Sequence, residues 1–208
     1  MQITAALLCG YLLGSLPFGY WLARLWGAGD IRRSGSGNTG ATNVWRVAGK
    51  APGLLTLALD IGKGCAAVAL ATALVEDPSA LEPARLGAGA AAVLGHMYSP
   101  LLKFRGGKGV NTALGVFAIL LPVETAVAVG AFVLTVLLSR MISLGSIVAA
   151  LTLAGVVIVE RVSGYHAPPE IYLPVAIALA VAIIFAHRAN IRRLLKGTEN
   201  KFSFSGKR

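Results

Sequence analysis

Runs of apolar residues long enough for a bilayer-spanning helix of about 20 residues recur along this chain from Ile3 to Ala186. Hydrophobic residues make up 56% of the 208 residues and charged residues only 13%, whereas a soluble domain usually carries about 25% charged residues. That leaves too little polar surface to coat a water-soluble globule. The sequence therefore predicts a membrane protein and argues against an ordinary soluble domain.

The breaks between the apolar runs predict an all-α bundle of about seven transmembrane helices in a single domain, residues 1–208. The fourth run is short for a span. Pro17, inside the first run, removes a backbone donor and is expected to bend that helix. The predicted helices lie near residues 3–26, 51–75, 84–102, 109–121, 123–139, 141–160 and 170–187.

Positive charge is unevenly distributed among the connections between these helices. If successive connections alternate sides, most of the 19 lysines and arginines fall on one side, together with the tail that ends in Lys207 and Arg208. Because a Lys/Arg excess marks the cytoplasmic face, the N-terminus is predicted outside, the C-terminus in the cytoplasm, and the number of spans odd. Topology thus explains the net charge of +10 without nucleic acid, although the basic face would favour anionic lipids or phosphorylated substrates.

The first segment that carries chemistry is RRSGSGNTGATNVWR, residues 32–46. Its glycines permit positive φ and a close approach of the backbone to a ligand, and its short polar side chains and final arginine add further donors. Such a loop can form an anion-binding nest of backbone amides. A flexible linker is the alternative, but a linker needs no Asn, Thr and Arg at set places. The candidate site residues are Gly35, Ser36, Gly37, Asn38, Thr39, Gly40, Thr42, Asn43 and Arg46.

The second segment is FRGGKGVNTALG, residues 104–115, in which Gly106, Gly107 and Gly109 surround Lys108 directly before an apolar helix. Orphan amides and the dipole at that helix start favour a phosphate, and Lys108 adds a point charge. The spacing is not that of a nucleotide-binding P-loop. Alone this motif is weak evidence, because basic membrane loops often contain Gly and Lys.

The third segment is HRANIRRLLKGTENK, residues 187–201. His187 and Asn190 share a helical face by their i, i+3 spacing and are expected to project together from the inner end of the last span. Gly197 is expected to end that helix before Glu199. A basic amphipathic tail on the membrane accounts for the arginines of this segment, but not for a His and an Asn on an apolar stripe.

Several isolated polar residues give smaller signals. Asp60 and Lys63, one turn apart inside a span, are interpreted either as a functional charge pair or as a pair that braces the site. Ser143 and Ser146 would hydrogen-bond a ligand or pack between helices. His96 is expected to be a satisfied interior histidine. The acids are few and fall mostly on the far side, so no metal cluster is expected.

Together the three segments resemble one family, the bacterial acyl-phosphate:glycerol-3-phosphate acyltransferases, which are integral membrane enzymes. Ser99 replaces the family's proline, with Pro100 following, and Asn111 stands where alanine is common. Order and spacing agree, so the resemblance covers essentially the whole chain. The matched patterns are GSGNTGATNxxR from Gly35 to Arg46, HxxPxxxxFxGGKGVxT from His96 to Thr112 with one exception, and HRxNIxRLxxGTExK from His187 to Lys201.

The resemblance implies transfer of a fatty acyl group from a long-chain acyl phosphate to the 1-hydroxyl of sn-glycerol-3-phosphate. The products would be 1-acyl-glycerol-3-phosphate (lysophosphatidic acid) and phosphate, in the first step of bacterial phospholipid synthesis. By position, Ser36, Arg46, His187 and Asn190 would be catalytic, the Lys108 loop would hold glycerol phosphate, and Glu199 would support the structure.

The resemblance also implies a place and a set of partners. The enzyme would be a multi-pass protein of the bacterial inner membrane with its active site facing the cytoplasm. It would contact membrane lipids and its two substrates, without a cofactor, a nucleic acid or a required protein partner. Neither acyl-CoA nor acyl carrier protein would be the donor.

Two other classes of protein fit parts of the pattern. A transporter for phosphorylated solutes would also need anion loops and charges inside the membrane, but it requires polar determinants that reach the midplane and beyond. A lipid phosphotransferase that uses CDP-activated alcohols would need several aspartates in one helix pair, and Asp60 stands alone. Product formation separates both from an acyltransferase.

Overall fold

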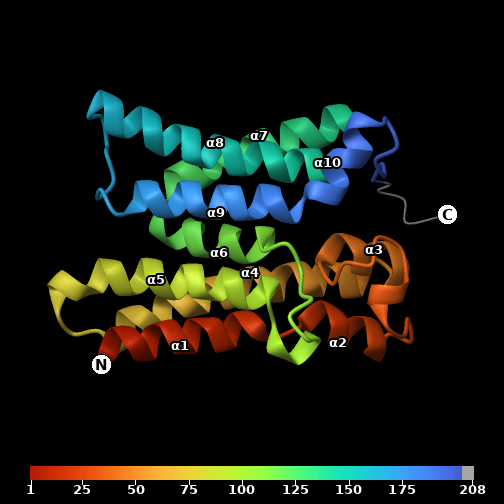
Figure 1. Cartoon of the computed structure of the whole chain (residues 1–208), viewed down its shortest axis with the longest axis horizontal. Helices are drawn as coiled ribbons and strands as arrows, with labels where there is room; N and C mark the ends of the chain where they lie inside the picture. Colours follow the sequence, from red (N-terminus) through yellow and green to blue (C-terminus); the bar gives the residue numbers. More distant parts are fainter. Residues whose placement is uncertain (203–208) are drawn as a thin grey trace. The chain divides into compact units, whose positions relative to one another are not determined.

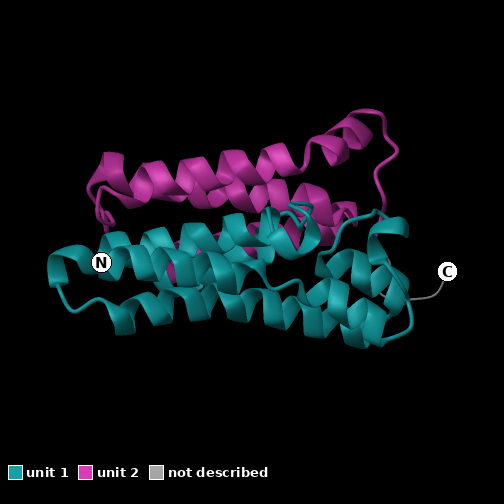
Figure 2. Cartoon of the chain, turned by 60° about the horizontal axis from the view of Figure 1, so that its bottom comes forward, with its two compact units in different colours: residues 1–120, 206–208 teal, residues 121–205 magenta. Residues whose placement is uncertain are grey.

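The computed structural model describes residues 1–202, which over that range form ten α-helices and two 3₁₀ turns without a strand (Figure 1). These elements divide into two compact units, residues 1–120 and, in the described part, residues 121–202 (Figure 2). Lys207 and Arg208, which the sequence assigns to the cytoplasmic side, lie outside the described residues.

The first unit contains the helices α1 to α6 (Figure 1). Their bounds are α1 (Gln2–Ser15), α2 (Phe18–Leu25), η1 (Ile31–Arg33), α3 (Ala41–Ala48), α4 (Lys50–Leu74), α5 (Pro78–Met97), η2 (Pro100–Leu102) and α6 (Val110–Leu120).

Pro17 breaks the first apolar run, as the sequence predicts. Helix α1 ends at Ser15 and α2 begins at Phe18, because Pro17 has no amide to continue the hydrogen-bond ladder. The break leaves the carbonyl oxygens of Ser15 and Leu16 available to other partners, and both are used by polar side chains from elsewhere in the unit.

Small residues let the helices of the first unit approach closely. A Cβ at Gly10 or Gly14 of α1 would collide with the carbonyl oxygen of Ala88 or Ala92 in α5. In the same way, a Cβ at Gly64 of α4 would collide with the backbone of α6. Close backbone contact of this kind is the usual way for membrane helices to associate, because apolar side chains gain little by leaving lipid.

The bounds predicted for the third helix, residues 84–102, are wrong at both ends. Helix α5 begins at Pro78, where the missing amide of proline costs nothing, and the Asp77 side chain accepts a hydrogen bond from the Ser79 amide at 2.9 Å. The hydrogen bonds that Asp77 accepts from the Ser79 hydroxyl and the Ser79 amide hold the pKa of Asp77 below its usual value. The helix ends at Met97, just before Pro100 opens the turn η2.

The second unit contains α7 (Pro122–Ser139), α8 (Ile142–Ser163), α9 (Tyr172–Ala186) and α10 (Arg188–Leu195). The short α10 continues α9 after a bend of 61° at His187. Gly197, with a φ of 69°, follows the end of α10, so the prediction that it ends the helix is confirmed.

All seven predicted helices are present, but they differ in their fitness to cross a membrane. Four stretches are long and apolar enough: residues 2–25 with their break, α4, α7 and α8. The bent pair of α9 and α10 makes a fifth if it counts as one span, and α6 is shorter at 11 residues. The structure therefore supports an all-helical protein with four or five candidate spans among its described residues.

Candidate functional site

The loop before α3 is organised by one side chain, Asn43. Its Oδ1 accepts a hydrogen bond from the Ser36 amide at 2.8 Å. Its Nδ2 lies within hydrogen-bond distance of the carbonyl oxygens of Asn38 (2.8 Å), Ser34 (3.0 Å) and Ile31 (3.3 Å). Asn43 is only 2% exposed, so its side-chain amide makes its hydrogen bonds within the loop and not to a ligand.

Two glycines of this loop adopt the backbone conformation that their sequence predicts. Gly35 and Gly37 have φ values of 60° and 71°, and a Cβ at Gly35 would collide with Oδ1 of Asn43. Gly40 has a negative φ and instead precedes α3, with its amide donated to Oδ1 of Asn38 at 2.8 Å. The loop therefore presents an exposed Ser36 on a fixed backbone, while Thr39 is buried.

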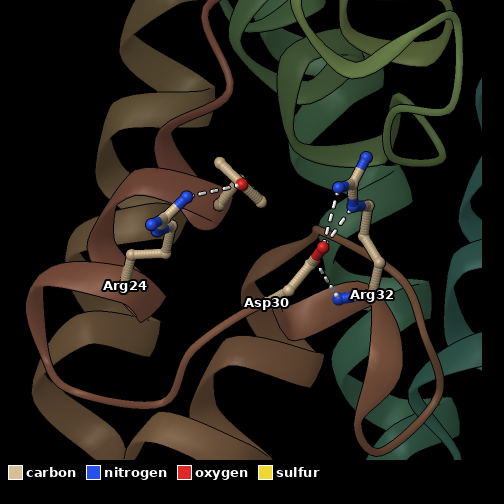
Figure 3. Close-up of polar contacts among 4 residues, drawn as sticks. Arg24, Asp30 and Arg32 are labelled. Atoms are coloured by element: carbon tan, nitrogen blue, oxygen red, sulfur yellow. Dashed lines mark hydrogen bonds and ion pairs between the residues drawn. The ribbon is translucent and has the colours of Figure 1, made fainter.

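A charged cluster holds the segment that leads into this loop (Figure 3). The Asp30 carboxylate accepts two hydrogen bonds from the Arg32 guanidinium, at 2.9 and 2.7 Å, and a third from the Arg32 amide. The side-chain bond from Arg32 is the main reason that the pKa of Asp30 falls to about 2. Arg24 donates to the hydroxyl of Tyr20 at 3.0 Å, and the Arg32 guanidinium lies 5.1 Å from the centre of the Tyr20 ring. No pattern in the sequence indicates this cluster.

The second glycine loop is anchored to the end of α5. The amides of Gly106 and Gly107 donate to the carbonyl oxygens of Met97 and His96, both at 3.0 Å. Gly109 has a φ of 81° and turns the chain into α6, which begins at the next residue. The half-buried Lys108 thus lies just before a helix start, as its sequence predicts.

The end of α5 is also tied to the end of α1 in a way that the sequence pattern did not indicate. Ser99, which replaces the family's proline, is 1% exposed and donates its hydroxyl to the carbonyl oxygen of Ser15 at 2.6 Å. Pro100 then starts the following turn. The departure from the family pattern therefore exchanges a rigid residue for a buried hydrogen bond.

Asp60 and Lys63 form an ion pair of 2.8 Å inside the first unit, with side chains 2% and 3% exposed. Lys63 also donates to the carbonyl oxygen of Leu16 at the helix break, at 3.0 Å. Nδ1 of His96 lies 3.5 Å from Oδ1 of Asp60. The expectation of an interior charge pair is confirmed, and the structure adds His96 to it.

In the second unit, His187 is 2% exposed and lies at the bend between α9 and α10. Its Nδ1 is 2.8 Å from the carbonyl oxygen of Ile183. Since a carbonyl only accepts, Nδ1 must carry the proton, and in a neutral ring the lone pair is then on Nε2.

Asn190, one turn further on, is tied to the segment after α10. Its Nδ2 donates to Oε1 of Glu199 at 2.8 Å, and Nε of Arg193 donates to Oε2 of the same carboxylate, also at 2.8 Å. Burial raises the pKa of Glu199, but the hydrogen bonds from Asn190 and Arg193 outweigh it and hold the pKa below its usual value. Glu199 thus fixes Asn190.

Ser143 and Ser146 are both buried in the first turns of α8. The Ser146 hydroxyl donates to the carbonyl oxygen of Ile142 in its own helix at 2.9 Å. For Ser146 this bond favours the packing interpretation over ligand binding. Within residues 1–202, no group of three or more His, Cys, Asp or Glu residues is arranged to hold a metal ion.

Replacing Glu199 by Gln should lower the free energy of unfolding by about 1–3 kcal/mol at neutral pH, because a charge-assisted bond to Arg193 is lost. Glu199 has a folded pKa below its ordinary 4.5, so its contribution is complete above that value and disappears as the pH falls through the lower one. The difference between wild type and Glu199→Gln should therefore stay constant down to about pH 5 and shrink in more acidic solution.

Chemical unfolding over a pH series measures this, with Glu170→Gln as the control. Glu170 also pairs with an arginine at 2.7 Å, but its side chain is 86% exposed, so its loss should cost less than about 1 kcal/mol. A Glu199→Gln effect that grew on acidification would contradict the assignment.

Two glycine-rich loops in the first unit and a buried His and Asn in the second indicate a class of protein. It is a helical membrane protein whose polar groups suit anionic, phosphorylated molecules. Comparison with known proteins identifies the family.

The chain matches the family described as Glycerol-3-phosphate acyltransferase over residues 4–197. It is 46% identical to the glycerol-3-phosphate acyltransferase of Syntrophotalea carbinolica over 197 residues, 94% of this chain and 95% of the relative. To that of Myxococcus xanthus it is 43% identical over 199 residues, 96% and 99% of the two chains.

Among solved structures, it resembles crystal structures of PlsY (YgiH), an integral membrane glycerol 3-phosphate acyltransferase. The glycerol 3-phosphate form gives a TM-score of 0.85 at 38% identity, over 98% of this chain and 96% of that one. The lysophosphatidic acid form gives 0.83 at 36% identity, over 99% and 98%. The chain belongs to the PlsY-type glycerol-3-phosphate acyltransferase family. It is an integral, multi-pass membrane enzyme of phospholipid synthesis.

Proposed function

We propose that this enzyme transfers a fatty acyl group from a long-chain acyl phosphate to the 1-hydroxyl of glycerol-3-phosphate, giving lysophosphatidic acid and inorganic phosphate. The identities of the acceptor and the product are inferred from one observation. The chain resembles, over nearly its full length, PlsY structures in a glycerol 3-phosphate form and a lysophosphatidic acid form. The family motifs that this sequence matches favour acyl phosphate as the donor.

The first unit supplies groups suited to a reaction that brings two phosphates together. Arg46 offers a planar fork for a phosphate, and Lys108 offers a point charge beside the amides at the start of α6. Ser36 lies exposed on a backbone that Asn43 fixes. We assign substrate binding to the two glycine loops, and catalysis to Ser36 and Arg46, because positive charge and positioned donors offset the repulsion of the anions.

The second unit contributes the buried pair His187 and Asn190, and we assign His187 a role other than that of a nucleophile. Nδ1 of His187 bonds the Ile183 carbonyl oxygen, and we propose that the ring contributes to catalysis by orienting the attacking hydroxyl. The glycerol oxygen would attack the acyl carbonyl carbon directly, the bond from that carbon to the phosphate oxygen would break, and the departing phosphate would end with the proton. Detection of an acylated Ser36 in rapidly quenched reactions would contradict direct attack.

We further propose that residues 1–208 act as one domain with seven spans, the N-terminus outside and the polar loops in the cytoplasm. The asymmetric distribution of lysine and arginine supports this orientation. Labelling of single cysteines introduced at exposed Lys50 and exposed Glu170 should find them on opposite sides of the inner membrane.

Purified protein in detergent, given palmitoyl phosphate and radiolabelled glycerol-3-phosphate, should form labelled lipid, and palmitoyl-CoA should not replace the donor. Ser36→Ala and Arg46→Ala should each reduce the rate by about 100-fold or more, because each removes a positioned polar group. Exposed Arg33, next to the same loop, gives the control Arg33→Ala, which should stay near the wild-type rate.

Two outcomes would contradict this function. Lipid formed equally well from palmitoyl-CoA would reject the donor. No lipid with any donor, from protein that remains folded and monodisperse, would reject the reaction and favour a transporter of phosphorylated solutes.

A further inference from the structure

The buried cluster of Asp60, Lys63 and His96 has no part in the reaction described above. Asp60 and Lys63 come from α4 and His96 from α5, and they are only 1%, 5% and 8% exposed. Burial of three ionisable groups is costly unless they are paired, and here each has a partner within the cluster. Simple filling of the core would be done better by apolar residues.

The two oxygens of the Asp60 carboxylate are in different surroundings. Oδ1 receives the Lys63 ammonium at 2.8 Å and Nδ1 of His96 at 3.5 Å. Oδ2 is buried and has no hydrogen-bond partner among residues 1–202. Asp60 lines a small cavity at the helix break, together with Thr39 of the first glycine loop. The cluster and Thr39 of the first loop therefore line the same cavity.

His96 lies between Asp60 and the second glycine loop. Its carbonyl oxygen accepts the Gly107 amide at 3.0 Å. The other edge of its ring, at Nε2, faces the Cα of Gly107 so closely that a Cβ on that residue would collide with the ring. The His96 ring is thus in contact with the residue directly before Lys108.

The Asp60 carboxylate fixes the orientation of this ring. A carboxylate next to Nδ1 selects the ring position in which Nδ1 carries a proton toward it, and so leaves Nε2 on the side of Gly107. Lys63 holds the carboxylate in turn, and is itself held by the Leu16 carbonyl oxygen at the Pro17 break. A chain of contacts therefore runs from the helix break through the charged cluster to the loop that carries Lys108: its first links are polar, and the last is the packing of the His96 ring against Gly107.

We propose that His96, oriented by Asp60, is a positioning residue for glycerol phosphate binding: its ring is the wall against which Gly107 packs, and it sets where the Lys108 loop lies at the start of α6. The inference rests on the proposed function, in which this loop holds the phosphate of glycerol-3-phosphate. A residue with this role affects binding of one substrate more than the chemical step. A residue that only filled the core would lower the amount of folded enzyme and leave the KM unchanged.

The first test separates these two roles by kinetics. His96→Ala should raise the KM for glycerol-3-phosphate by about tenfold, with kcat and the KM for palmitoyl phosphate changed by less than about threefold. The KM does not depend on the fraction of protein that is folded, so partial loss of folded enzyme does not obscure the result. An unchanged KM for glycerol-3-phosphate in His96→Ala would overturn the proposal.

The second test uses the contact between the ring and Gly107. Gly107→Ala should raise the same KM by about tenfold or more, because the added methyl group collides with the His96 ring. The double variant His96→Ala/Gly107→Ala puts that methyl group in the space that the ring leaves. Its KM should be about that of His96→Ala or lower, well below the product of the two single effects, and this shortfall is the rescue that we expect.

Gly106 provides the matched control. A Cβ at Gly106 would collide with the backbone carbonyl oxygen of His96, which His96→Ala does not remove. His96→Ala should therefore fail to rescue Gly106→Ala. Equal rescue of both glycine variants, or rescue of neither, would overturn the proposal.

The wild-type enzyme distinguishes failure of the inference from failure of the function. Wild-type protein that makes lipid and saturates with glycerol-3-phosphate, combined with unaltered KM values in the variants, rejects only the role of His96. Folded wild-type protein that makes no lipid rejects the proposed function and this inference with it.

Discussion

Replacing Lys63 by methionine is expected to lower the free energy of unfolding by about 3–5 kcal/mol. Lys63 pairs with Asp60 at 2.8 Å, and both side chains are almost completely buried. Methionine fills a similar volume but leaves the Asp60 carboxylate without its cation in a poorly polarisable interior, where an unpaired charge is costly. Unfolding of the purified protein in mixed micelles titrated with SDS measures the loss.

The double variant Asp60→Asn/Lys63→Met should recover much of that stability, because it removes both charges together. Lys50→Met is a control in the same helix, since Lys50 is exposed at the start of α4 and should cost less than about 0.5 kcal/mol. A double variant no more stable than Lys63→Met would show that the charge pair is not the source of the effect.

Replacing Asn43 by alanine is expected to lower kcat/KM by about 100-fold while the helices stay folded. The side chain holds the Ser36 amide and three carbonyl oxygens of the first glycine loop. Without it, the loop loses the contacts that set the position of Ser36, and small displacements of catalytic groups have large effects on rate. Lipid formation from palmitoyl phosphate measures this, with circular dichroism to confirm helix content.

Asn43→Asp tests the explanation further. Aspartate keeps the acceptor for the Ser36 amide but places a carboxylate oxygen against the carbonyl oxygens that Nδ2 faced, so its activity should be no higher than that of Asn43→Ala. Asn111→Ala, the same change near the other loop, should stay within about threefold of wild type. Near-normal activity of Asn43→Asp would contradict the role as a loop organiser.

The strongest sequence signals are those with a local physical cause. Pro17 must interrupt a helix because it has no amide, and the structure breaks there. Gly35, Gly37, Gly109 and Gly197 have the positive φ values that other residues avoid, and each marks a turn. The apolar runs likewise locate the helices, since the bilayer dictates both their length and their composition.

Properties that depend on distant partners could not be found in this way. Asn43 resembles a ligand-binding side chain in sequence, but its four partners lie up to 12 positions away and become visible only when the loop is folded. The contact of His96 with Gly107 depends on where α5 ends, which the sequence pattern placed at residue 102 instead of Met97. The span count does not follow from the apolar runs alone, because α6 has only 11 residues and α5 is not among the helices that are both long and apolar enough to cross a membrane.

The short length of helix α6 affects how the enzyme binds its water-soluble substrate. Eleven residues of α-helix are about 16 Å long, roughly half the thickness of the hydrocarbon layer of a bilayer. If α6 is one of seven spans, the loop at its start lies beneath the headgroups or the bilayer thins around it. Glycerol phosphate would then have to descend below the membrane surface to reach Lys108, where weaker screening by water strengthens every charge contact. The thickness of the surrounding lipid would help to set the KM for a substrate that is itself freely soluble in water.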